Sequence, residues 1–204
     1  MKSILILGAG GFAREVYWHL NEHYDDFVFF DDVTGIKELT LAGKNYRVVA
    51  NLSDLPHDLK HFIVGVGNPK VKAHLVEKAI AARLIPAPPF IHPRAVVQDA
   101  SIGAGSIITP NCTITTNVTI GQHVIVNINS TVGHDAILGN YVTINPGVNV
   151  SGNVTIGDGV VVGTGTVIRE KAYICAGAII GAQAAVIQDI IEAGTYVGIP
   201  AKRK

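Results

Sequence analysis

The stretch 126–149 reads VNINST-VGHDAI-LGNYVT-INPGVN, four blocks of six residues that each begin with an aliphatic residue. The spacing continues without interruption from Val96 to Val186, which makes sixteen consecutive aliphatic positions. The fifth residue of a block is Ala, Ser, Cys, Thr or Val in fifteen of the sixteen blocks, and only Ile190 is larger. A period of six suits neither an α-helix nor an alternating strand, so it indicates a repeat architecture in the second half of the chain.

The composition argues against several classes of protein. Charged residues make up 16% and hydrophobic residues 48% of the 204 residues, and the formal net charge is zero, unlike a disordered or coiled-coil chain. No Lys or Arg lies between Arg94 and Arg169, so the repeat has no basic stripe for nucleic acid. The uncharged stretch 172–188 keeps the six-residue spacing and is interpreted as repeat, not as a membrane span. The apolar run 4–7 is too short for a signal peptide, so no targeting segment is expected.

The first part of the chain alternates strand and helix signals. Strands are expected over 3–7, 27–30 and 61–66, and helices over 12–24 and 71–82. This β–α–β order predicts a small parallel sheet. Prolines at 86, 88, 89 and 93 then mark a boundary. We therefore expect an α/β domain over 1–85 and an all-β domain over 86–204.

The turn Gly8-Ala9-Gly10-Gly11-Phe12-Ala13 matches the pattern G-x-G-x-x-A, and Asp31 follows 23 residues after Gly8. This pattern is typical of dinucleotide binding. A domain of about 85 residues lacks the second mononucleotide-binding half that NAD requires. A single nucleotide, such as the UDP part of a sugar nucleotide, is therefore the expected ligand. Turn glycines without any ligand are the alternative.

The expected nucleotide site lies at the ends of the parallel strands. Phosphate groups would lie at the N-terminus of the first helix, and the two aspartates that end the second strand would lie near ribose or base. Gly67 and Asn68 follow the end of a further parallel strand, at the edge where such sheets bind ligands. The predicted substrate-binding residues are Gly10, Gly11, Phe12, Asp31, Asp32, Gly67 and Asn68.

The chain as a whole resembles a known family. The six-residue blocks, the glycine turn, Asp31-Asp32 and the tail 197–202 (VGIPAK) are similar to those of the sialic-acid O-acetyltransferase / nucleotide-sugar N-acetyltransferase family, which includes the acetyltransferases of UDP-4-amino-sugars. The resemblance implies a half-Rossmann domain followed by a left-handed parallel β-helix, with three blocks in each triangular coil and the aliphatic residues inside. It also implies acetyl-CoA as co-substrate and a homotrimer with active sites between subunits.

His134 is the third residue of the block 132–137, so it is expected to point away from the aliphatic core. Asp135 follows it, and a carboxylate beside an imidazole can orient the ring and raise its basicity. The resemblance implies that His134 is the catalytic base and that the acidic residue assists it, although relatives often carry Glu where this chain has Asp135. A solvated surface histidine is the alternative.

Two asparagines and a glycine complete the expected catalytic set. Seven residues before the histidine, the family carries an Asn that supports the substrate or the base, and Asn127 occupies this position here. Asn145 lies one 18-residue coil later and should stack on Asn127. An Asn ladder that only satisfies turn hydrogen bonds is an equal alternative. Gly152 lies one coil above His134, where its backbone N–H could stabilise an oxyanion. An ordinary turn glycine is the alternative.

The family register also suggests a groove for coenzyme A. The residues that would line it are Thr143, Thr164 and Ala182. Candidates for contacts with its phosphates are Arg169, Lys171 and the basic tail 202–204, which could equally be solvated. No metal site is expected, because the chain lacks the histidine spacing of the related γ-class carbonic anhydrases, and His123 is interpreted as a surface residue.

The two cysteines indicate the compartment. Cys112 and Cys175 lie 63 residues apart, which is 3.5 coils of 18 residues. At roughly 4.8 Å per stacked strand their separation along the axis is about 17 Å, too far for a disulfide. A reducing, cytoplasmic setting is therefore expected.

Together with these residues, the resemblance implies an acetyl-CoA-dependent N-acetyltransferase of a nucleotide-linked amino sugar in bacterial surface-glycan biosynthesis. The expected substrate is a UDP-4-amino-4,6-dideoxy hexose, and the expected mechanism is direct transfer with His134 as general base. Three rival hypotheses remain: O-acetylation of sialic acid or another sugar hydroxyl, a non-catalytic nucleotide-sugar-binding β-helix scaffold, and an NAD-dependent oxidoreductase.

Overall fold

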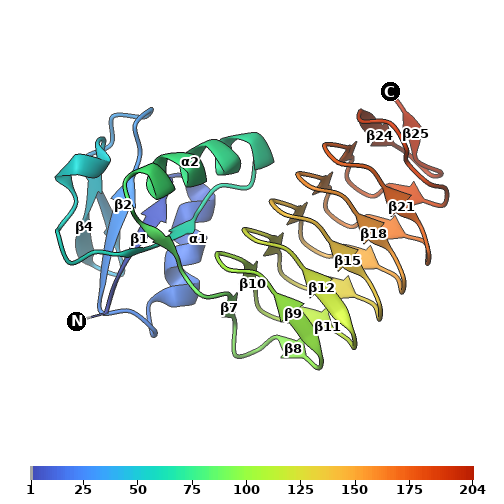
Figure 1. The fold of residues 1–204 in the computed structure, drawn as a ribbon, viewed down its shortest axis with the longest axis horizontal. Coiled ribbons are helices and arrows are strands. Elements are labelled where there is room, and N and C mark those ends of the chain that lie inside the picture. Colours follow the sequence, from blue (N-terminus) through green and yellow to red (C-terminus); the bar gives the residue numbers. More distant parts are fainter. Residues whose placement is uncertain (1) are drawn as a thin grey trace. The chain divides into compact units, whose positions relative to one another are not determined.

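The computed structural model describes residues 2–204. They form two compact units, a first that ends at Ala87 and a second that runs from Pro88 to Lys204. In Figure 1 the first unit contains both helices and the second is a stack of short strands. The two units therefore follow the two different sequence patterns of the chain.

The first unit is a six-stranded sheet in the order β3-β4-β2-β1-β5-β6, parallel except for the pair β3-β4. Its central strand, β1, is an apolar run whose residues Ile4 to Leu7 are all 0% exposed, as expected for a parallel strand that is covered on both faces. The elements are β1 (Ser3–Leu7), α1 (Gly11–Leu20), β2 (Asp26–Phe30), β3 (Glu38–Leu41), β4 (Lys44–Val49), the 3-10 helix η1 (Leu52–Asp54), β5 (His61–Val64), α2 (Pro69–Ala81) and β6 (Ile85–Pro86).

The connections of this sheet create a switch point at its centre. The chain leaves β1 through α1 to reach β2 on one side, whereas β5 leads through α2 to β6 on the other side. The loops after β1 and β5 therefore diverge at neighbouring strand ends. Open α/β sheets bind ligands in the crevice that such a divergence creates.

Sequence reasoning missed the hairpin β3-β4. Leu41 pairs with Lys44 across the two-residue turn Ala42-Gly43, and both turn residues have positive φ, +51° and +74°. This is the backbone that a tight type I′ hairpin needs, and Gly43 adopts it without strain. The alternation of apolar and polar residues on either side of the Gly could have revealed the hairpin.

The other elements of the first unit begin or end a few residues from the predicted positions. The strand predicted over 61–66 ends at Val64 because the next residue, Gly65, packs under α1: a Cβ there would lie 2.7 Å from Ala13 Cα. Helix α2 begins at Pro69 because the side chain of Asn68 accepts hydrogen bonds from the backbone N–H groups of residues 70 and 71, at 3.0 and 3.2 Å.

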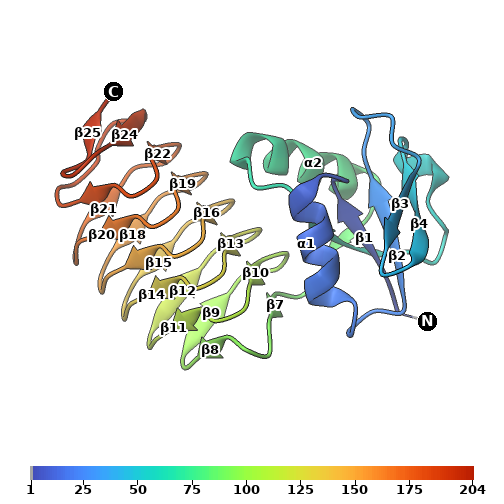
Figure 2. The same ribbon diagram turned by 180° about the vertical axis from the view of Figure 1, so that it is seen from behind.

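The second unit is a left-handed parallel β-helix with three stacked sheets (Figure 2). The first sheet holds β7 (Phe90–Ile91), β10 (Ile107–Ile108), β13 (Ile125–Val126), β16 (Thr143–Ile144), β19 (Val161–Val162), β22 (Ile179–Ile180), β24 (Thr195–Val197) and β25 (Lys202–Arg203). The second holds β8 (Val96–Val97), β11 (Thr113–Ile114), β14 (Thr131–Val132), β17 (Asn149–Val150), β20 (Val167–Ile168) and β23 (Ala185–Val186). The third holds β9 (Ala100–Ile102), β12 (Val118–Ile120), β15 (Ile137–Leu138), β18 (Thr155–Ile156) and β21 (Tyr173–Ile174).

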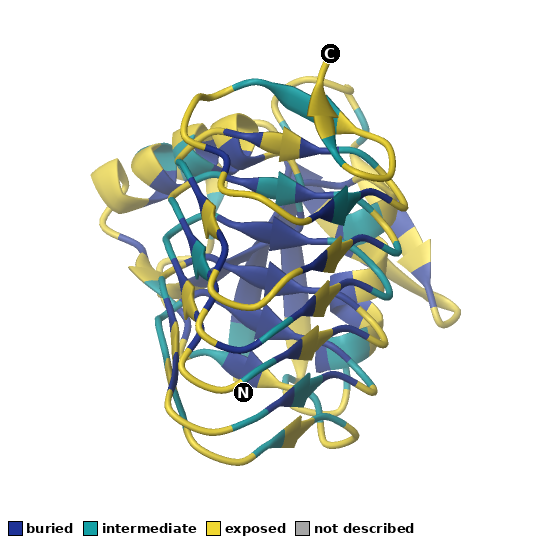
Figure 3. Ribbon diagram, turned by 90° about the vertical axis from the view of Figure 1, so that its right-hand side faces the viewer, coloured by how far each residue is buried: buried dark blue, intermediate teal, exposed yellow. Residues whose placement is uncertain are grey.

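The six-residue spacing becomes a buried column inside the β-helix. Residues 18 apart pair, as Val132 does with Val150, so each coil uses three blocks. Every block-initial residue from Ile108 to Val186 is at most 2% exposed. In Figure 3 buried stretches, in dark blue, recur from coil to coil along this stack beside exposed and intermediate ones. Burial of this continuous apolar column is the main source of stability that the repeat provides.

The first coil departs from the predicted register. Val96, which the spacing placed inside, is 54% exposed, and the partly buried Val97 packs against the core instead. The pairing agrees, because Val97 lies opposite Ile114. The first coil has a stacked neighbour on one side only, so nothing below it enforces the spacing of the later coils.

The corners of the prism place polar residues on the outside. At the corner between the second and third sheets, the fourth residue of each block has left-handed φ: Asn117 (+56°), Asp135 (+59°), Asn153 (+60°) and Lys171 (+61°). Asn and Asp tolerate this backbone better than most residues. These residues form a column of stacked turns, 18 residues apart. No helix within residues 2–204 is long and apolar enough to cross a bilayer.

Candidate active site

His134 and Asp135 lie in the turn between β14 and β15, at the corner between the second and third sheets of the β-helix. Their side chains are 58% and 43% exposed, so both point away from the aliphatic core. His134 Nδ1 lies 2.7 Å from Asp135 Oδ2. Because the carboxylate can only accept, Nδ1 carries the hydrogen and the Nε2 lone pair is left available as a base.

Asn117, which sequence reasoning did not single out, belongs to the same cluster. It lies in the equivalent turn one coil earlier, and its Nδ2 donates to Asp135 Oδ1 at 2.6 Å. Hydrogen bonds from His134 and then from Asn117 hold the pKa of Asp135 below its ordinary value. The signal was in the repeat itself, because Asn117 is the residue 18 positions before Asp135 and must stack on it.

Gly152 packs directly against the imidazole. A Cβ at residue 152 would lie 2.5 Å from His134 Nε2 and 2.7 Å from Cε1. No hydrogen bond from the N–H of Gly152 to a backbone acceptor is present among the described residues, whereas its carbonyl accepts from Lys171 N–H at 3.0 Å. The structure thus brings the nitrogen that can act as a base and a candidate oxyanion donor together at one corner.

Asn127 and Asn145 lie at another corner, after β13 and β16 of the first sheet. Each satisfies a backbone group: Asn127 Oδ1 accepts from the N–H of residue 128 at 2.9 Å, and Asn145 Nδ2 donates to the carbonyl of residue 162 at 2.9 Å. The side-chain ladder occurs two residues later in the turn, where Asn111 Nδ2 donates to Asn129 Oδ1 at 3.1 Å. Asn127 and Asn145 therefore make the backbone hydrogen bonds that are expected if these residues only stabilise the turns.

The three residues predicted for coenzyme A differ in exposure. Thr164 and Ala182 are exposed in successive turns of the same corner, and Thr164 O accepts from the N–H of Gln183 at 2.7 Å. Thr143 lies on β16 of the first sheet and is only 4% exposed. Thr164 and Ala182 are therefore accessible to a ligand, whereas Thr143 is buried.

A cleft of about 500 Å³ occupies the switch point of the first unit. It lies at the carboxyl ends of β1, β2 and β5 and continues along α2. The lining residues are Gly8, Phe30, Asp31, Asp32, Val33, Val66, Lys70, Val71, His74, Leu75 and Lys78. The cleft therefore includes the two predicted aspartates, whereas the predicted Gly10, Gly11, Phe12, Gly67 and Asn68 lie outside its lining.

A row of basic side chains along α2 forms one wall of this cleft. Lys70, His74 and Lys78 are spaced four residues apart, so they lie on one face of the helix. Sequence reasoning missed this row, although the i, i+4, i+8 spacing was visible in it. The row provides cationic donors opposite the aspartates, which suits a ligand with negatively charged phosphates.

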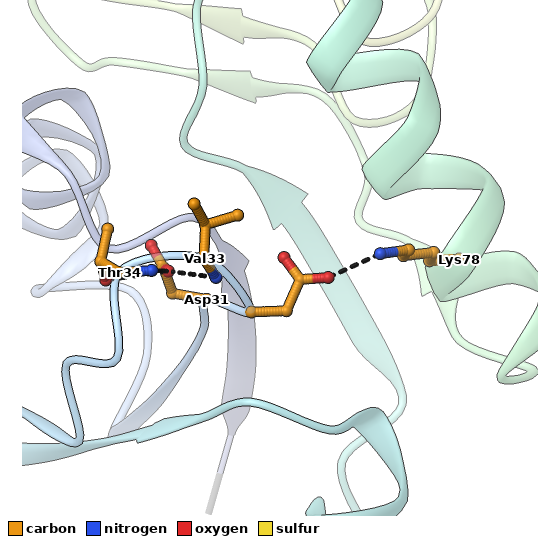
Figure 4. A network of polar contacts seen from close by, with 5 residues as sticks. Asp31, Val33, Thr34 and Lys78 are labelled. Atoms are coloured by element: carbon orange, nitrogen blue, oxygen red, sulfur yellow. Dashed lines mark hydrogen bonds and ion pairs between the residues drawn. The ribbon is translucent and has the colours of Figure 1, made fainter.

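Asp31 binds the surrounding loop rather than open solvent. Its Oδ1 accepts from the N–H of Val33 at 3.0 Å and from the N–H and Oγ1 of Thr34 at 2.7 and 2.9 Å (Figure 4). Burial raises the pKa of Asp31, but hydrogen bonds from Thr34, Val33 and the backbone of Ala9 outweigh it and leave the pKa below its ordinary value. The contact with Ala9 connects the loop after β2 to the glycine turn after β1.

Asp32 has a different partner. Lys78 Nζ reaches across from α2 to its Oδ2 at 2.6 Å, and the two side chains are 29% and 39% exposed (Figure 4). This ion pair crosses the cleft, so it places an acceptor and a donor side by side where a ligand would bind. Such an exposed pair adds little to stability, about 0–1 kcal/mol.

The glycine turn leaves its helix N-terminus open. Gly10 caps α1 without a side-chain hydrogen bond, and a Cβ at Gly10 or Gly11 would meet no atom within 4 Å. The N-terminus of α1 therefore has room for a ligand beside Gly10 and Gly11, and helix N-termini favour anions. Asn68 is occupied differently, because its carboxamide caps α2.

His123 is not the surface residue that the sequence suggested. It is 1% exposed and stacks on Tyr141 from the next coil, with ring centroids 5.4 Å apart and planes 12° apart. The turn residues of adjacent coils lie on top of one another, so an aromatic neighbour covers the ring. Among the described residues, no group of three or more His, Cys, Asp or Glu side chains is arranged to hold a metal ion.

Comparison with known proteins gives matches in both units. Residues 3–79 match the family described as PglD N-terminal domain, and residues 137–170 match the bacterial transferase hexapeptide family (six repeats). The GDP-perosamine N-acetyltransferase of Escherichia coli is 36% identical over 125 residues, which are 55% of this chain and 53% of that protein. The match therefore spans about half the length of that curated relative.

Solved structures match the whole chain. The acetyltransferase domain of PglB from Neisseria gonorrhoeae is 31% identical with a TM-score of 0.90, and the alignment covers 100% of both chains. The same domain in complex with acetyl coenzyme A is 32% identical, has a TM-score of 0.89, and covers 100% of this chain and 99% of that one. PerB from Caulobacter crescentus, in complex with CoA and GDP-perosamine, is 27% identical with a TM-score of 0.87 and covers 99% and 97%.

Proposed function

The chain belongs to the hexapeptide-repeat acetyltransferases that carry a PglD-type N-terminal domain, and from this membership we propose that it transfers the acetyl group of acetyl-CoA to the amino group of a nucleotide-linked amino sugar. The PglB domain with bound acetyl coenzyme A and the named N-acetyltransferase of GDP-perosamine support this reaction. The observation that carries the proposal is the exposed His134–Asp135 pair, whose nitrogen Nε2 lies against Gly152.

In the proposed mechanism His134 is the general base. The sugar amine attacks the thioester carbonyl, a C–N bond forms, and Nε2 takes the proton that the amine loses. Asp135 holds the Nδ1–H and stabilises the imidazolium. The Gly152 N–H stabilises the oxyanion, the C–S bond breaks, and the proton passes from His134 to the departing thiolate. Asn127 is a candidate substrate contact, and its burial at another corner makes it a weaker one than Gly152.

The nucleotide would lie in the cleft of the first unit. The basic row Lys70, His74 and Lys78 would face the diphosphate, and the open N-terminus of α1 at Gly10, Gly11 and Phe12 offers a second anion site. Asp32 offers a carboxylate to ribose or base. Gly67 and Asn68 would shape the loop at the neighbouring strand end. Thr164, Ala182 and Thr143 remain candidates for coenzyme A.

The expected sugar nucleotide is a UDP-4-amino-4,6-dideoxy hexose. GDP-perosamine, which is named in the description of a relative, is the alternative substrate. We place the reaction in bacterial surface-glycan biosynthesis in the cytoplasm. We also propose a homotrimer. Outward-facing apolar side chains on all three sheets support it, since Ile137, Val167 and Ile179 are 48%, 47% and 46% exposed and would be covered in an assembly.

The test measures acetyl transfer from acetyl-CoA to UDP-4-amino-4,6-dideoxy hexose and to GDP-perosamine. Release of the thiol gives the rate, and mass spectrometry identifies the product. We expect His134→Ala to lower kcat by about 10²–10⁴-fold, and His57→Ala, on the surface of the first unit, to leave it unchanged. Transfer at a near wild-type rate by His134→Ala would contradict the mechanism. Hydroxylamine distinguishes the rival reaction, because it cleaves an O-acetyl ester and leaves an N-acetyl amide intact. Binding of both ligands without any turnover would instead favour the scaffold hypothesis.

A further inference from the structure

We propose that Asn117 is a positioning residue for the base: its carboxamide holds one oxygen of Asp135 so that the other oxygen stays on His134 Nδ1. Two short contacts carry this inference. Asn117 Nδ2 lies 2.6 Å from Asp135 Oδ1, and Asp135 Oδ2 lies 2.7 Å from His134 Nδ1. The three side chains form a chain of hydrogen bonds in which each oxygen of the carboxylate has one partner.

The fold explains why Asn117 can do this. Asn117 and Asp135 occupy the same turn position in successive coils, both with left-handed backbone, φ +56° and +59°. The backbone is stacked as well, because the N–H of Asp135 donates to the carbonyl of Thr116 at 3.1 Å. The carboxamide is therefore delivered to the carboxylate by the register of the β-helix, without a flexible linker.

Exposure explains why Asp135 needs a second partner. The side chains of His134 and Asp135 are 58% and 43% exposed, so water competes for both oxygens of the carboxylate. A carboxylate held at one oxygen can rotate about its terminal torsion, which is broad for Asp. A donor at each oxygen fixes the plane of the carboxylate. The orientation of the imidazole, and with it the direction of the Nε2 lone pair, is then fixed too.

A second ladder in the same protein separates this role from ordinary turn stacking. Asn111 also has left-handed φ, +60°, and its Nδ2 donates to Asn129 Oδ1, 18 residues later, at 3.1 Å. That ladder lies at another corner, and Asn129 does not bind a histidine in the described structure. Asn111, whose Oδ1 also accepts a hydrogen bond from Arg94 Nη2 at 3.1 Å, is therefore a control with the same turn position, the same kind of ladder bond and no connection to the proposed base.

The experiment compares Asn117→Gly with Asn111→Gly. Glycine keeps the left-handed backbone free of strain and removes only the carboxamide. The assay uses acetyl-CoA with whichever of UDP-4-amino-4,6-dideoxy hexose and GDP-perosamine the wild type acetylates faster. We expect kcat of Asn117→Gly to fall about five- to tenfold, as for the loss of a hydrogen bond to a charged group that is open to water, with both KM values unchanged. Asn111→Gly should keep the wild-type kcat and show a similar shift in Tm.

A double-mutant cycle tests the route through Asp135. Glu at 135 carries its carboxylate one methylene further, out of the register that Asn117 serves. Asn117→Gly should therefore lower kcat much less in the Asp135→Glu background than in the wild type. Equal effects in both backgrounds would overturn the inference, as would an unchanged kcat in Asn117→Gly. Asn117→Asp, which keeps the shape and loses the donor, should also lower kcat, and it serves if the glycine variant does not fold.

The inference rests on the proposed role of His134 as the base, and one further variant separates the two failures. If His134→Ala is active, the mechanism under the proposed function fails. If His134→Ala is inactive while Asn117→Gly matches the wild type, only the role of Asn117 fails.

Discussion

The imidazole of His134 lies against the backbone of Gly152 one coil further along the β-helix, so close that a Cβ at residue 152 would come within 2.5 Å of Nε2. The contact joins two residues 18 apart in sequence, which is the repeat length of one coil. A base and a backbone N–H that acts on the same reacting centre must be adjacent, and the stacking of coils makes them so.

Gly152→Ala should therefore abolish most of the activity. The new methyl group must displace the imidazole, and a displacement of about 1 Å can cost 100-fold in rate. The control is Gly157→Ala, where the Cβ would also be crowded, at 2.5 Å from Ala176 N, but far from His134 in the register. We expect both variants to lose stability and only Gly152→Ala to lose about 100-fold in kcat. Equal kcat values in the two variants would show that the contact has no catalytic meaning.

Asp31→Ala should weaken nucleotide binding without changing chemistry. The carboxylate connects the 31–34 loop to the glycine turn through Val33, Thr34 and Ala9, so its loss loosens both walls of the cleft. We expect KM for the sugar nucleotide to rise about tenfold, the effect of losing hydrogen bonds to a charged group, while kcat and the KM for acetyl-CoA stay the same. Asp54→Ala, in the short helix η1, is the control. A fall in kcat with constant KM would contradict this role.

Lys78→Met should show whether the cleft of the first unit binds the phosphates of the nucleotide. The ion pair with Asp32 is partly exposed, so stability should change by no more than about 1 kcal/mol. If the basic row faces phosphates, KM for the sugar nucleotide rises about tenfold and becomes less sensitive to salt. Titration calorimetry with the isolated nucleoside diphosphate measures the same effect without catalysis. An unchanged affinity would place the phosphates elsewhere.

Lys72 should make stability depend on pH above neutrality. It is 0% exposed in α2, and burial lowers its pKa from the ordinary 10.5 to about 7. Between pH 7 and 10.5 the unfolded chain carries a proton on this amine that the folded chain lacks, so the stability rises with pH, by at most about 1.4 kcal/mol per pH unit. Below pH 7 both states carry the proton and the contribution is constant.

The measurement is Tm against pH for the wild type, Lys72→Met and, as control, the exposed neighbour Lys70→Met. The rise between pH 7 and 10 should be smaller in Lys72→Met and unchanged in Lys70→Met. A wild-type slope in Lys72→Met would mean that Lys72 keeps its charge in the folded protein.

Much of the architecture could be predicted because a period of six repeated sixteen times leaves few foldings of the chain. The register also predicted that His134 points outward and that Gly152 lies one coil away. It did not predict Val97 in place of Val96, because the end coil has no lower neighbour to hold the spacing. Nor did it predict the burial of His123, which depends on the aromatic ring that the next coil places above it.

The sequence by itself determined the repeat, the parallel sheet of the first unit, and the positions of the histidine and the glycine turn, because these follow from local spacing. Only the tertiary structure decided which polar groups meet. It placed the carboxamide of Asn117 on the Asp135 oxygen that does not bind His134. It also directed the Asp31 carboxylate to the N–H groups of its own loop and brought the basic row of α2 to Asp32. Whether a hydrogen bond forms depends on differences of a few tenths of an ångström in the donor–acceptor distance, here between residues far apart in the chain. A spacing rule assigns residues to the same corner or the same cleft, and the packed coordinates then decide which atoms touch.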